Sequence, residues 1–266
     1  DWSAYDQYVD WQLSHQPHGL FAVCGSSEMH WLDLDERLAL AKRAVERAGD
    51  VPVVATANLE TDRTRRIAEM AQMAETGVAG FVLVPPDGLG LEQDQLEAYF
   101  ATLADQSPLP VLLYEWPQMN PCEIDPAVYG RLVADHGIIG IKDTTCTLEG
   151  IQAKIDAAPD SIVYQANTPF LMDAFEMGAR GTMAITSTAA ADISVKLWEA
   201  MTRGERTEAE QHHQQLVMLD ALLRFGYPAT AKYLAQLRGL PFEMTCRTPS
   251  VLRAEGAKAM SVWWEG

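Results

Sequence analysis

One lysine stands out as a possible nucleophile. Lys142 ends an otherwise apolar run, residues 138–141, and is followed by Asp143. Apolar surroundings disfavour the ammonium form, so a lysine in such a place has a lowered pKa and holds more of the neutral amine that attacks carbonyl carbons. The same side chain could instead reach solvent at the end of its strand or pair with Asp143. Position alone therefore makes Lys142 a candidate and leaves the structural alternative open.

Two further groups could act with this amine. Tyr114 also ends an apolar run, and its phenol could transfer a proton, although a core tyrosine would fit the same place. Ser26 and Ser27 follow Gly25 after another apolar run. Their hydroxyl and backbone N–H groups could bind a carboxylate, but the same composition is common in turns.

Seven short apolar runs alternate with helical segments and would position these groups. The runs start roughly 20 to 32 residues apart, which is the length of one β/α unit. They lack polar alternation, as expected for parallel strands that are buried on both faces. The runs are residues 19–24, 51–57, 80–84, 110–114, 138–142, 161–164 and 181–185.

The alternation fits either a β/α barrel or a doubly wound sheet. No GxGxxG follows the first run, and beyond residue 185 the sequence holds only helical signals, so the barrel fits better. Reacting groups in such a barrel lie at the C-terminal ends of strands and in the loops that follow. We therefore predict an α/β TIM (β/α)8 barrel as a single domain over residues 1–266. Residues 187–266 would supply the last barrel helix and a C-terminal helical region.

One strand of the expected barrel is missing from this count. Eight strands close the barrel and remove its edges, but only seven apolar runs are visible. The sequence opens on a helical pattern, residues 2–13, where a strand should already have been laid down. We therefore expect an apolar strand upstream of Asp1, and a closed eight-stranded barrel within residues 1–266 would refute this expectation.

Composition excludes several classes of partner. The 266 residues include 37 Asp and Glu against 20 Lys and Arg, a net charge of −17, which argues against binding to nucleic acid or to an anionic membrane surface. No apolar run approaches the roughly 20 residues that span a bilayer, and no signal-peptide pattern opens the sequence. The four cysteines lack the spacing of metal ligands, which favours free thiols, a cytoplasmic location and no metal.

Three motifs, taken in their order and spacing, resemble the dihydrodipicolinate synthase / N-acetylneuraminate lyase family. That family consists of class I aldolases, which work through a lysine Schiff base on a TIM barrel. The motifs are Gly25-Ser26-Ser27-Glu28, Tyr114-x-x-Pro117 and Gly140-Ile141-Lys142-Asp143. The resemblance covers essentially the whole chain.

The resemblance implies a role for each matching residue. Lys142 matches the Schiff-base lysine of the family, and Tyr114 matches its proton-transferring tyrosine. It further implies a pyruvate-type 2-oxo acid as substrate, no cofactor, and a homo-oligomer, either a tetramer or a dimer. The residues that would bind the substrate are Gly25, Ser26, Ser27, Ala184 and Ile185.

The sequence also departs from the family pattern. The second glycine of the first loop is absent, and residues 86–88 replace an aromatic motif that reaches a neighbouring subunit's site. Residues 118–120 lack the arginine that binds a second carboxylate, so lysine-pathway synthase activity is not expected. Aromatic and acidic replacements suggest a pocket with more aromatic surface and less positive charge; they are His30, Trp31, Glu115, Trp116 and Met119.

Three functions remain in view. The first is a lyase that forms or breaks a C–C bond of a 2-oxo acid through Lys142. The second is a hydratase or dehydratase of the same family, acting on a sugar-derived or aromatic 2-oxo acid. The third is a barrel that binds a small acid without converting it.

Overall fold

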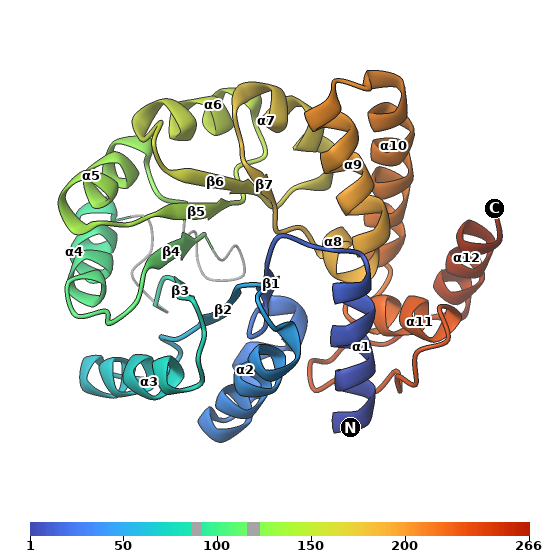
Figure 1. The fold of residues 1–266 in the computed structure, drawn as a ribbon, viewed down its shortest axis with the longest axis horizontal. Helices are drawn as coiled ribbons and strands as arrows, with labels where there is room; N and C mark the ends of the chain where they lie inside the picture. Colours follow the sequence, from blue (N-terminus) through green and yellow to red (C-terminus); the bar gives the residue numbers. More distant parts are fainter. Residues whose placement is uncertain (87–91, 116–122) are drawn as a thin grey trace.

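The fold is described here from a computed structural model that covers residues 1–86, 92–115 and 123–266. Its centre is a parallel sheet of seven strands, hydrogen-bonded in the order in which they occur along the chain. The sheet curls around the middle of the molecule, with α2 to α7 on its outside (Figure 1). This confirms the predicted β/α alternation. The strands are β1 Leu20–Phe21, β2 Val53–Thr56, β3 Gly80–Leu83, β4 Val111–Tyr114, β5 Gly140–Asp143, β6 Ile162–Gln165 and β7 Gly181–Thr182.

Helices follow the strands and then continue alone to the C-terminus, as the sequence predicts. The outer helices of the curled sheet are α2 Leu34–Ala48, α3 Arg63–Glu75, α4 Gln93–Ala104, α5 Pro126–His136, α6 Leu148–Ala157 and α7 Leu171–Met177. The remaining helices are α1 Trp2–Ser14, α8 Ile185–Ala189, α9 Ala191–Arg203, α10 Arg206–Leu223, α11 Ala229–Leu237 and α12 Ala254–Glu265. Short 3₁₀ turns are η1 Gly25–Ser27, η2 Met29–Trp31 and η3 Thr168–Phe170.

The middle of the sheet is buried on both faces. Every residue of β3, β4 and β5 is buried, which explains why these runs show no polar alternation. Gly140 of β5 has to be a glycine, because an added Cβ would lie 2.3 Å from the Ile162 carbonyl oxygen on β6. Because β5 and β6 approach closely at this glycine, β5, which carries Lys142, is held in place against β6.

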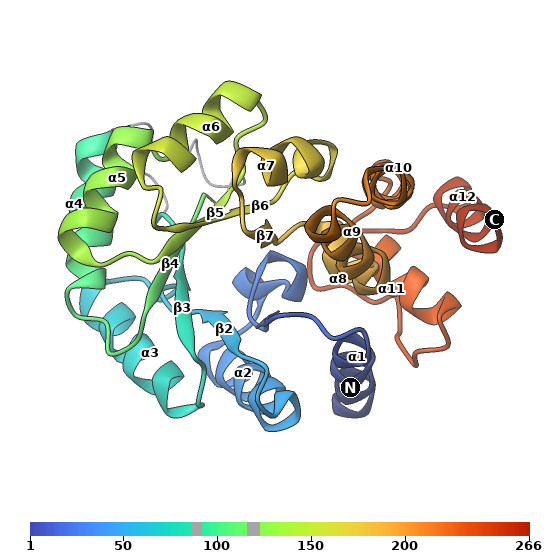
Figure 2. The ribbon, with the colours of Figure 1, turned by 45° about the horizontal axis from the view of Figure 1, so that its top comes forward.

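The C-terminal helices form a second apolar core beside the sheet. Leu197, Leu216, Leu219 and Leu234 belong to it and are fully buried. Figure 2 shows α8 to α12 gathered on one side of the curled sheet, with α1 between them and α2. Because α1 also contacts α2, the two parts of the molecule share this helix.

The seventh strand is shorter than the sequence predicts. We expected residues 181–185 to be extended, but the strand covers only Gly181–Thr182, and Ile185 is the first residue of α8. Ala184 takes the extended cap position of that helix. A run of small and apolar residues is compatible with either state, so the pattern alone could not place this boundary.

The two outermost strands, β1 and β7, each pair with one neighbour among the described residues. The eighth strand therefore stays a prediction. Within the described part of the chain, no helix is both long and apolar enough to cross a membrane. Cys24, Cys146 and Cys246 are free thiols, while Cys122 lies outside the described residues.

Candidate active site

Lys142 lies on β5, and its buried amine lies over two aromatic rings. Its Nζ is 3.9 Å from the centre of the Tyr114 ring and 5.7 Å from that of Phe21. Burial lowers the pKa of Lys142 from 10.5 to about 8, while the Cys24 thiol acts weakly in the opposite direction. Desolvation therefore raises the fraction of neutral amine, as the apolar run before Lys142 suggests.

Tyr114 stands beside Lys142 because the two strands are in register. The Cα of Tyr114 at the end of β4 is paired with the Cα of Lys142 on β5. Burial raises the pKa of the Tyr114 phenol well above its usual range, and the Cys24 and Tyr227 groups add to this effect. The phenol is therefore protonated near neutral pH and can act as a proton donor.

The loop after β1 brings one of its two serines into a hydroxyl network. Ser26 Oγ accepts a hydrogen bond from the Tyr227 hydroxyl and a longer one, 3.3 Å, from Thr188 Oγ1. Ser27 Oγ instead donates to the Ala22 carbonyl oxygen at 2.7 Å. The structure thus directs Ser26 toward the C-terminal helices and uses the Ser27 hydroxyl to hold the loop against its own strand.

Glu28 closes this loop and links it to the end of the chain. The residue is in the left-handed region, with φ of 59°, and its carboxylate is 8% exposed. The carboxylate accepts from Lys232 Nζ at 2.7 Å, from the Arg247 N–H at 2.6 Å and from the Thr248 N–H at 2.8 Å. Burial alone would raise the pKa of Glu28, but these donors outweigh burial and lower it. An ionised Glu28 therefore fixes the end of the loop that carries Ser26.

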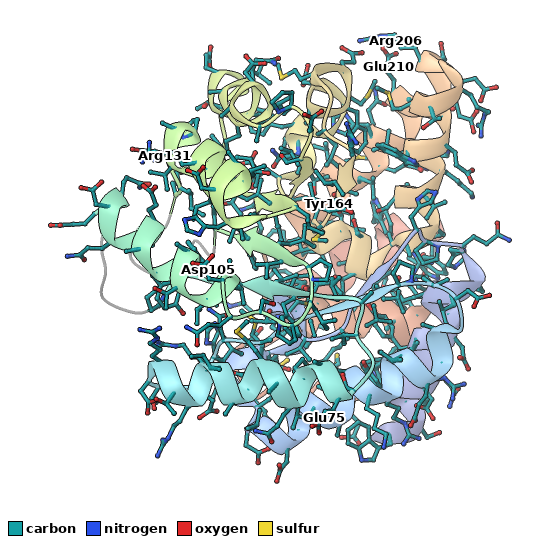
Figure 3. All side chains as sticks on the ribbon, turned by 60° about the vertical axis from the view of Figure 1, so that its left-hand side comes forward. Glu75, Asp105, Arg131, Tyr164, Arg206 and Glu210 are labelled. Carbon is teal, nitrogen blue, oxygen red and sulfur yellow. The ribbon has the colours of Figure 1, made fainter. Side chains whose placement is uncertain are left out.

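A cavity of about 620 Å³ opens beside these groups. Lys142, Ser26 and Tyr227 line it, as do Tyr164 of β6 and Ala184 after β7. In Figure 3 Tyr164 lies toward the middle of the molecule, whereas the other labelled residues, Glu75, Asp105, Arg131, Arg206 and Glu210, lie toward its periphery.

The cavity continues away from Lys142 toward α1 and the C-terminal helices. Its wall there is mixed and includes five aromatic residues, Tyr5, Tyr8, Trp11, Trp198 and Phe242. β1 and β7 border the same cavity, through Leu20, Phe21, Gly181 and Thr182.

Several predicted site residues lie elsewhere. Ile185 packs against the C-terminal core and is not part of the cavity wall. Trp31, expected to add aromatic surface, is 52% exposed. Glu115 is buried and bonded to Lys154, as described below. The motif residues Trp116, Pro117 and Met119, the positions 118–120 and Asp87-Gly88 lie outside the described residues.

Sequence reasoning missed two residues that contact Ser26: Thr188 on α8, and Tyr227, which directly precedes Pro228. No local pattern marks either residue, because each lies far from Ser26 in the sequence; Tyr227 is 201 residues away. Among the described residues, no group of His, Cys, Asp and Glu side chains has the arrangement of a metal site.

The chain matches known proteins over almost its whole length. The model of the dihydrodipicolinate synthetase family matches residues 1–261. A 4-hydroxy-tetrahydrodipicolinate synthase of Ectopseudomonas mendocina is 29% identical over 244 residues, which is 90% of this chain and 83% of that protein. The probable 2-dehydro-3-deoxy-D-pentonate aldolase YjhH of Escherichia coli K12 is 27% identical over 267 residues, 97% of this chain and 88% of that protein.

Solved structures show the same fold. YagE of Escherichia coli K12, a prophage protein of the dihydrodipicolinic acid synthase family solved with pyruvate, superimposes with a TM-score of 0.92 at 24% identity. The match covers 100% of this chain and 92% of YagE. A monomeric dihydrodipicolinate synthase variant also gives a TM-score of 0.92, at 22% identity and with 90% of its chain covered.

Proposed function

Because this chain belongs to the dihydrodipicolinate synthetase family, whose relatives are aldolases and related lyases, we propose that it acts on a pyruvate-type 2-oxo acid through a Schiff base on Lys142. The observation that carries the proposal is the buried Lys142 amine, held 3.9 Å from the Tyr114 ring at the wall of a cavity. Its lowered pKa, about 8, leaves roughly a tenth of the amine neutral at pH 7, against roughly one part in three thousand at an ordinary value.

In the proposed reaction the neutral Lys142 amine attacks the ketone carbon and forms a carbinolamine. Proton transfer to its hydroxyl releases water and leaves an iminium ion. The substrate's C4 hydroxyl then gives its proton to the Tyr114 phenolate left by the previous step, and the C3–C4 bond breaks. The electron pair of that bond forms the C2=C3 double bond of an enamine, the iminium nitrogen takes up the pair of its C=N bond, and the C4 fragment leaves as an aldehyde. Protonation of the enamine and hydrolysis release the 2-oxo acid and return the amine. The reverse sequence forms the C–C bond.

Tyr114 is the proton donor in this scheme. Its phenol, kept protonated by burial, can deliver a proton to the departing hydroxyl and recover one from the C4 hydroxyl of the substrate as the C–C bond breaks. The β4–β5 register places it next to Lys142, so amine and phenol can reach the same substrate carbon and its oxygen.

Ser26 is the carboxylate anchor that the geometry supports best. Its hydroxyl lies on the cavity wall and accepts from Tyr227, whereas the Ser27 hydroxyl is already bonded to the Ala22 carbonyl. Gly25 and Ser27 hold the loop that presents Ser26, and Ala184 lines the cavity from the other side.

Borohydride trapping tests the proposal directly. With pyruvate present, borohydride should reduce the imine to a stable secondary amine, and mass spectrometry should find one adduct on the peptide that contains Lys142. Lys142→Met removes the amine at similar length and serves as the control that must give no adduct. An adduct on another lysine, or none with a broad panel of 2-oxo acids and folded protein, would refute the assignment; the latter result would favour a barrel that only binds a small acid.

A second reaction fits the same family, a hydratase or dehydratase acting on a sugar-derived or aromatic 2-oxo acid. The aromatic cavity residues Tyr8, Trp11, Trp198 and Phe242 do not decide between the two reactions, because that cavity is also bordered by β1 and β7, which lack a second neighbour among the described residues. Assays of C–C cleavage and of water loss with matched aromatic and aliphatic 2-oxo acids separate the two reactions.

Three wider features belong to the same proposal. An extended segment lying between β7 and β1 would close the barrel, since both strands pair on one side only among the described residues and border one cavity. We further propose a homo-oligomer, dimer or tetramer, which sedimentation would measure. The free thiols of Cys24, Cys146 and Cys246 support a cytoplasmic location.

A further inference from the structure

A buried cation lies directly behind the candidate site. Lys154 of α6 is 2% exposed, and its ammonium group donates three hydrogen bonds. The acceptors are Asp143 Oδ1 at 2.9 Å, Thr145 Oγ1 at 2.6 Å and Glu115 Oε1. All three donors of the ammonium are therefore used, and none of them faces the cavity.

The two acidic partners of Lys154 are the chain neighbours of the two candidate catalytic residues. Glu115 directly follows Tyr114, and Asp143 directly follows Lys142. Successive side chains of a strand point to opposite faces of the sheet. The amine and the phenol therefore lie on the inner face, while the two carboxylates lie on the outer face, where Lys154 bonds to both. The helix of Lys154, α6, lies outside the curled sheet (Figure 1).

Further hydrogen bonds hold both carboxylates in place, so the cluster is rigid. Glu115 accepts from the Ile124 N–H at 2.7 Å and from the Thr144 N–H at 3.1 Å. Asp143 Oδ2 accepts from Gln165 Nε2 on β6 at 2.8 Å. One buried cluster thus connects the ends of β4, β5 and β6 with α6.

We propose that Lys154 is a positioning residue: its ammonium holds the ends of β4 and β5 together and thereby fixes the Lys142 amine against the Tyr114 phenol. This inference rests on the proposed function of those two residues. Misplacement of reacting groups by about 1 Å can cost about 100-fold in rate, so a contact that fixes both strand ends has a large effect on the reaction.

The charge balance of the cluster makes this role depend on pH. Burial raises the pKa of Glu115 to about 7; attraction to Lys154 opposes the rise, and repulsion from Asp143 adds to it. Among the described residues, the phenol of Tyr129 on α5 also faces this carboxylate. Burial would lower the pKa of Lys154, but the two carboxylates outweigh burial and raise it, so Lys154 stays charged. As the pH falls through about 7, Glu115 takes up a proton and the tie between Lys154 and β4 weakens.

Pyruvate alone is enough to test the role of Lys154, because the enzyme can exchange its methyl protons without a second substrate. Loss of a methyl proton from the pyruvate iminium gives the enamine, and deuteration from heavy water returns pyruvate with a C–D bond. Proton NMR measures this exchange, which depends on the position of the proton-transferring group, whereas borohydride trapping measures imine formation on Lys142. The two readouts separate positioning from nucleophilicity.

In the Lys154→Met variant we expect exchange to fall by about 10- to 100-fold while the trapped adduct still forms. Lys154→Arg keeps the charge and should recover part of the exchange rate. Lys42→Met, on the exposed side of α2, is the matched control and should leave both readouts unchanged. A folded Lys154→Met protein with wild-type exchange would overturn the inference.

A second variant guards against misfolding, because removing Lys154 alone leaves two buried carboxylates without a counter-ion. Lys154→Met combined with Glu115→Gln and Asp143→Asn makes the cluster neutral. It should still form the adduct and lose about 10-fold or more in exchange. Because protonation of Lys142 slows exchange at low pH in wild type and variant alike, the pH readout is the ratio of the exchange rate to the rate of adduct formation. This ratio should fall on the acid side of about pH 7 in wild type and stay constant in this variant. Wild-type exchange rate and pH profile in this variant would equally overturn the inference. Failure of wild type itself to form an adduct would overturn the proposed function and this inference together.

Discussion

Replacing Lys142 by methionine should make the protein more stable while removing its chemistry. Met keeps nearly the length of Lys but has no charge, so it removes the cost of burying an ammonium group among Phe21, Tyr114 and β5. Groups that are costly to bury persist at functional sites, where stability and activity oppose each other.

The magnitude follows from the pKa of Lys142. Lowering this pKa from 10.5 to about 8 corresponds to about 3 kcal/mol, at about 1.4 kcal/mol per pKa unit. Attraction between the ammonium and the faces of the Tyr114 and Phe21 rings offsets about 0.5–2 kcal/mol of this cost. We therefore expect Lys142→Met to raise the free energy of unfolding by about 1–3 kcal/mol at pH 7.

The stability that Lys142→Met gains over wild type should decrease as the pH rises. Because the folded-state pKa of Lys142 is lowered, the unfolded chain binds more protons between about pH 8 and 10.5, and wild-type stability rises over that range. The methionine variant lacks this rise. The advantage of the variant should therefore be constant below about pH 8 and shrink by about 2 kcal/mol between pH 7 and 9.5.

Urea unfolding followed by tryptophan fluorescence, at pH 7 and at pH 9.5, measures this difference. Lys42→Met, exposed on α2, is the matched control and should change stability by less than about 0.5 kcal/mol with no trend in pH. If Lys142→Met does not raise the free energy of unfolding at pH 7, or raises it equally at pH 9.5, then burial of the Lys142 ammonium does not destabilise the protein.

The other predictions concern the chemistry of the site. Tyr114→Phe keeps the ring but removes the hydroxyl, so turnover should fall about 10²- to 10⁴-fold with the fold intact by circular dichroism; a near-normal rate would make Tyr114 a packing residue. Ser26→Ala should raise the KM for pyruvate. Ser27→Ala should mainly lower thermal stability, because the Ser27 hydroxyl bonds to the Ala22 carbonyl. Equal effects of the two variants on KM would contradict the separate roles of the two serines. The initial rate of borohydride-trapped adduct formation should increase with pH and reach half its maximum near pH 8, since neutral Lys142 is the nucleophile; a rate that does not change between pH 6 and 9 would argue against it.

Local patterns were enough to predict the strands that carry the two candidate catalytic residues. The apolar run before Lys142 predicted both a buried strand and a desolvated amine, and β5 shows both properties. The run that ends at Tyr114 likewise predicted β4, and the parallel register of the two strands places the two side chains together. A strand that is buried on both faces is a short, continuously apolar run, so the local sequence pattern is enough to indicate it.

Contacts between distant segments could not be predicted in the same way. Tyr227 reaches Ser26 from 201 residues away, and no pattern near either residue shows it. Glu115 was interpreted as a pocket residue, but it faces α6 and bonds to Lys154. A signal for this did exist, because the residue after an inward-facing Tyr114 must point to the outer face of the sheet. Its partner Lys154, 39 residues later, could be found only from the packing of α6.

The bonds of Glu28 have a consequence for the order in which the molecule can be completed during synthesis. The carboxylate accepts from Lys232 and from the backbone of residues 247 and 248, up to 220 residues later. A ribosome that adds about 5–20 residues per second needs roughly 10–45 s to make that length of chain. During this interval the strands of the first half can pair, but Glu28 has none of its donors and the loop that presents Ser26 is not held. A nascent or truncated chain ending before residue 248 therefore has the strand of the proposed nucleophile, Lys142, but the loop of the proposed carboxylate anchor, Ser26, is not yet held in place.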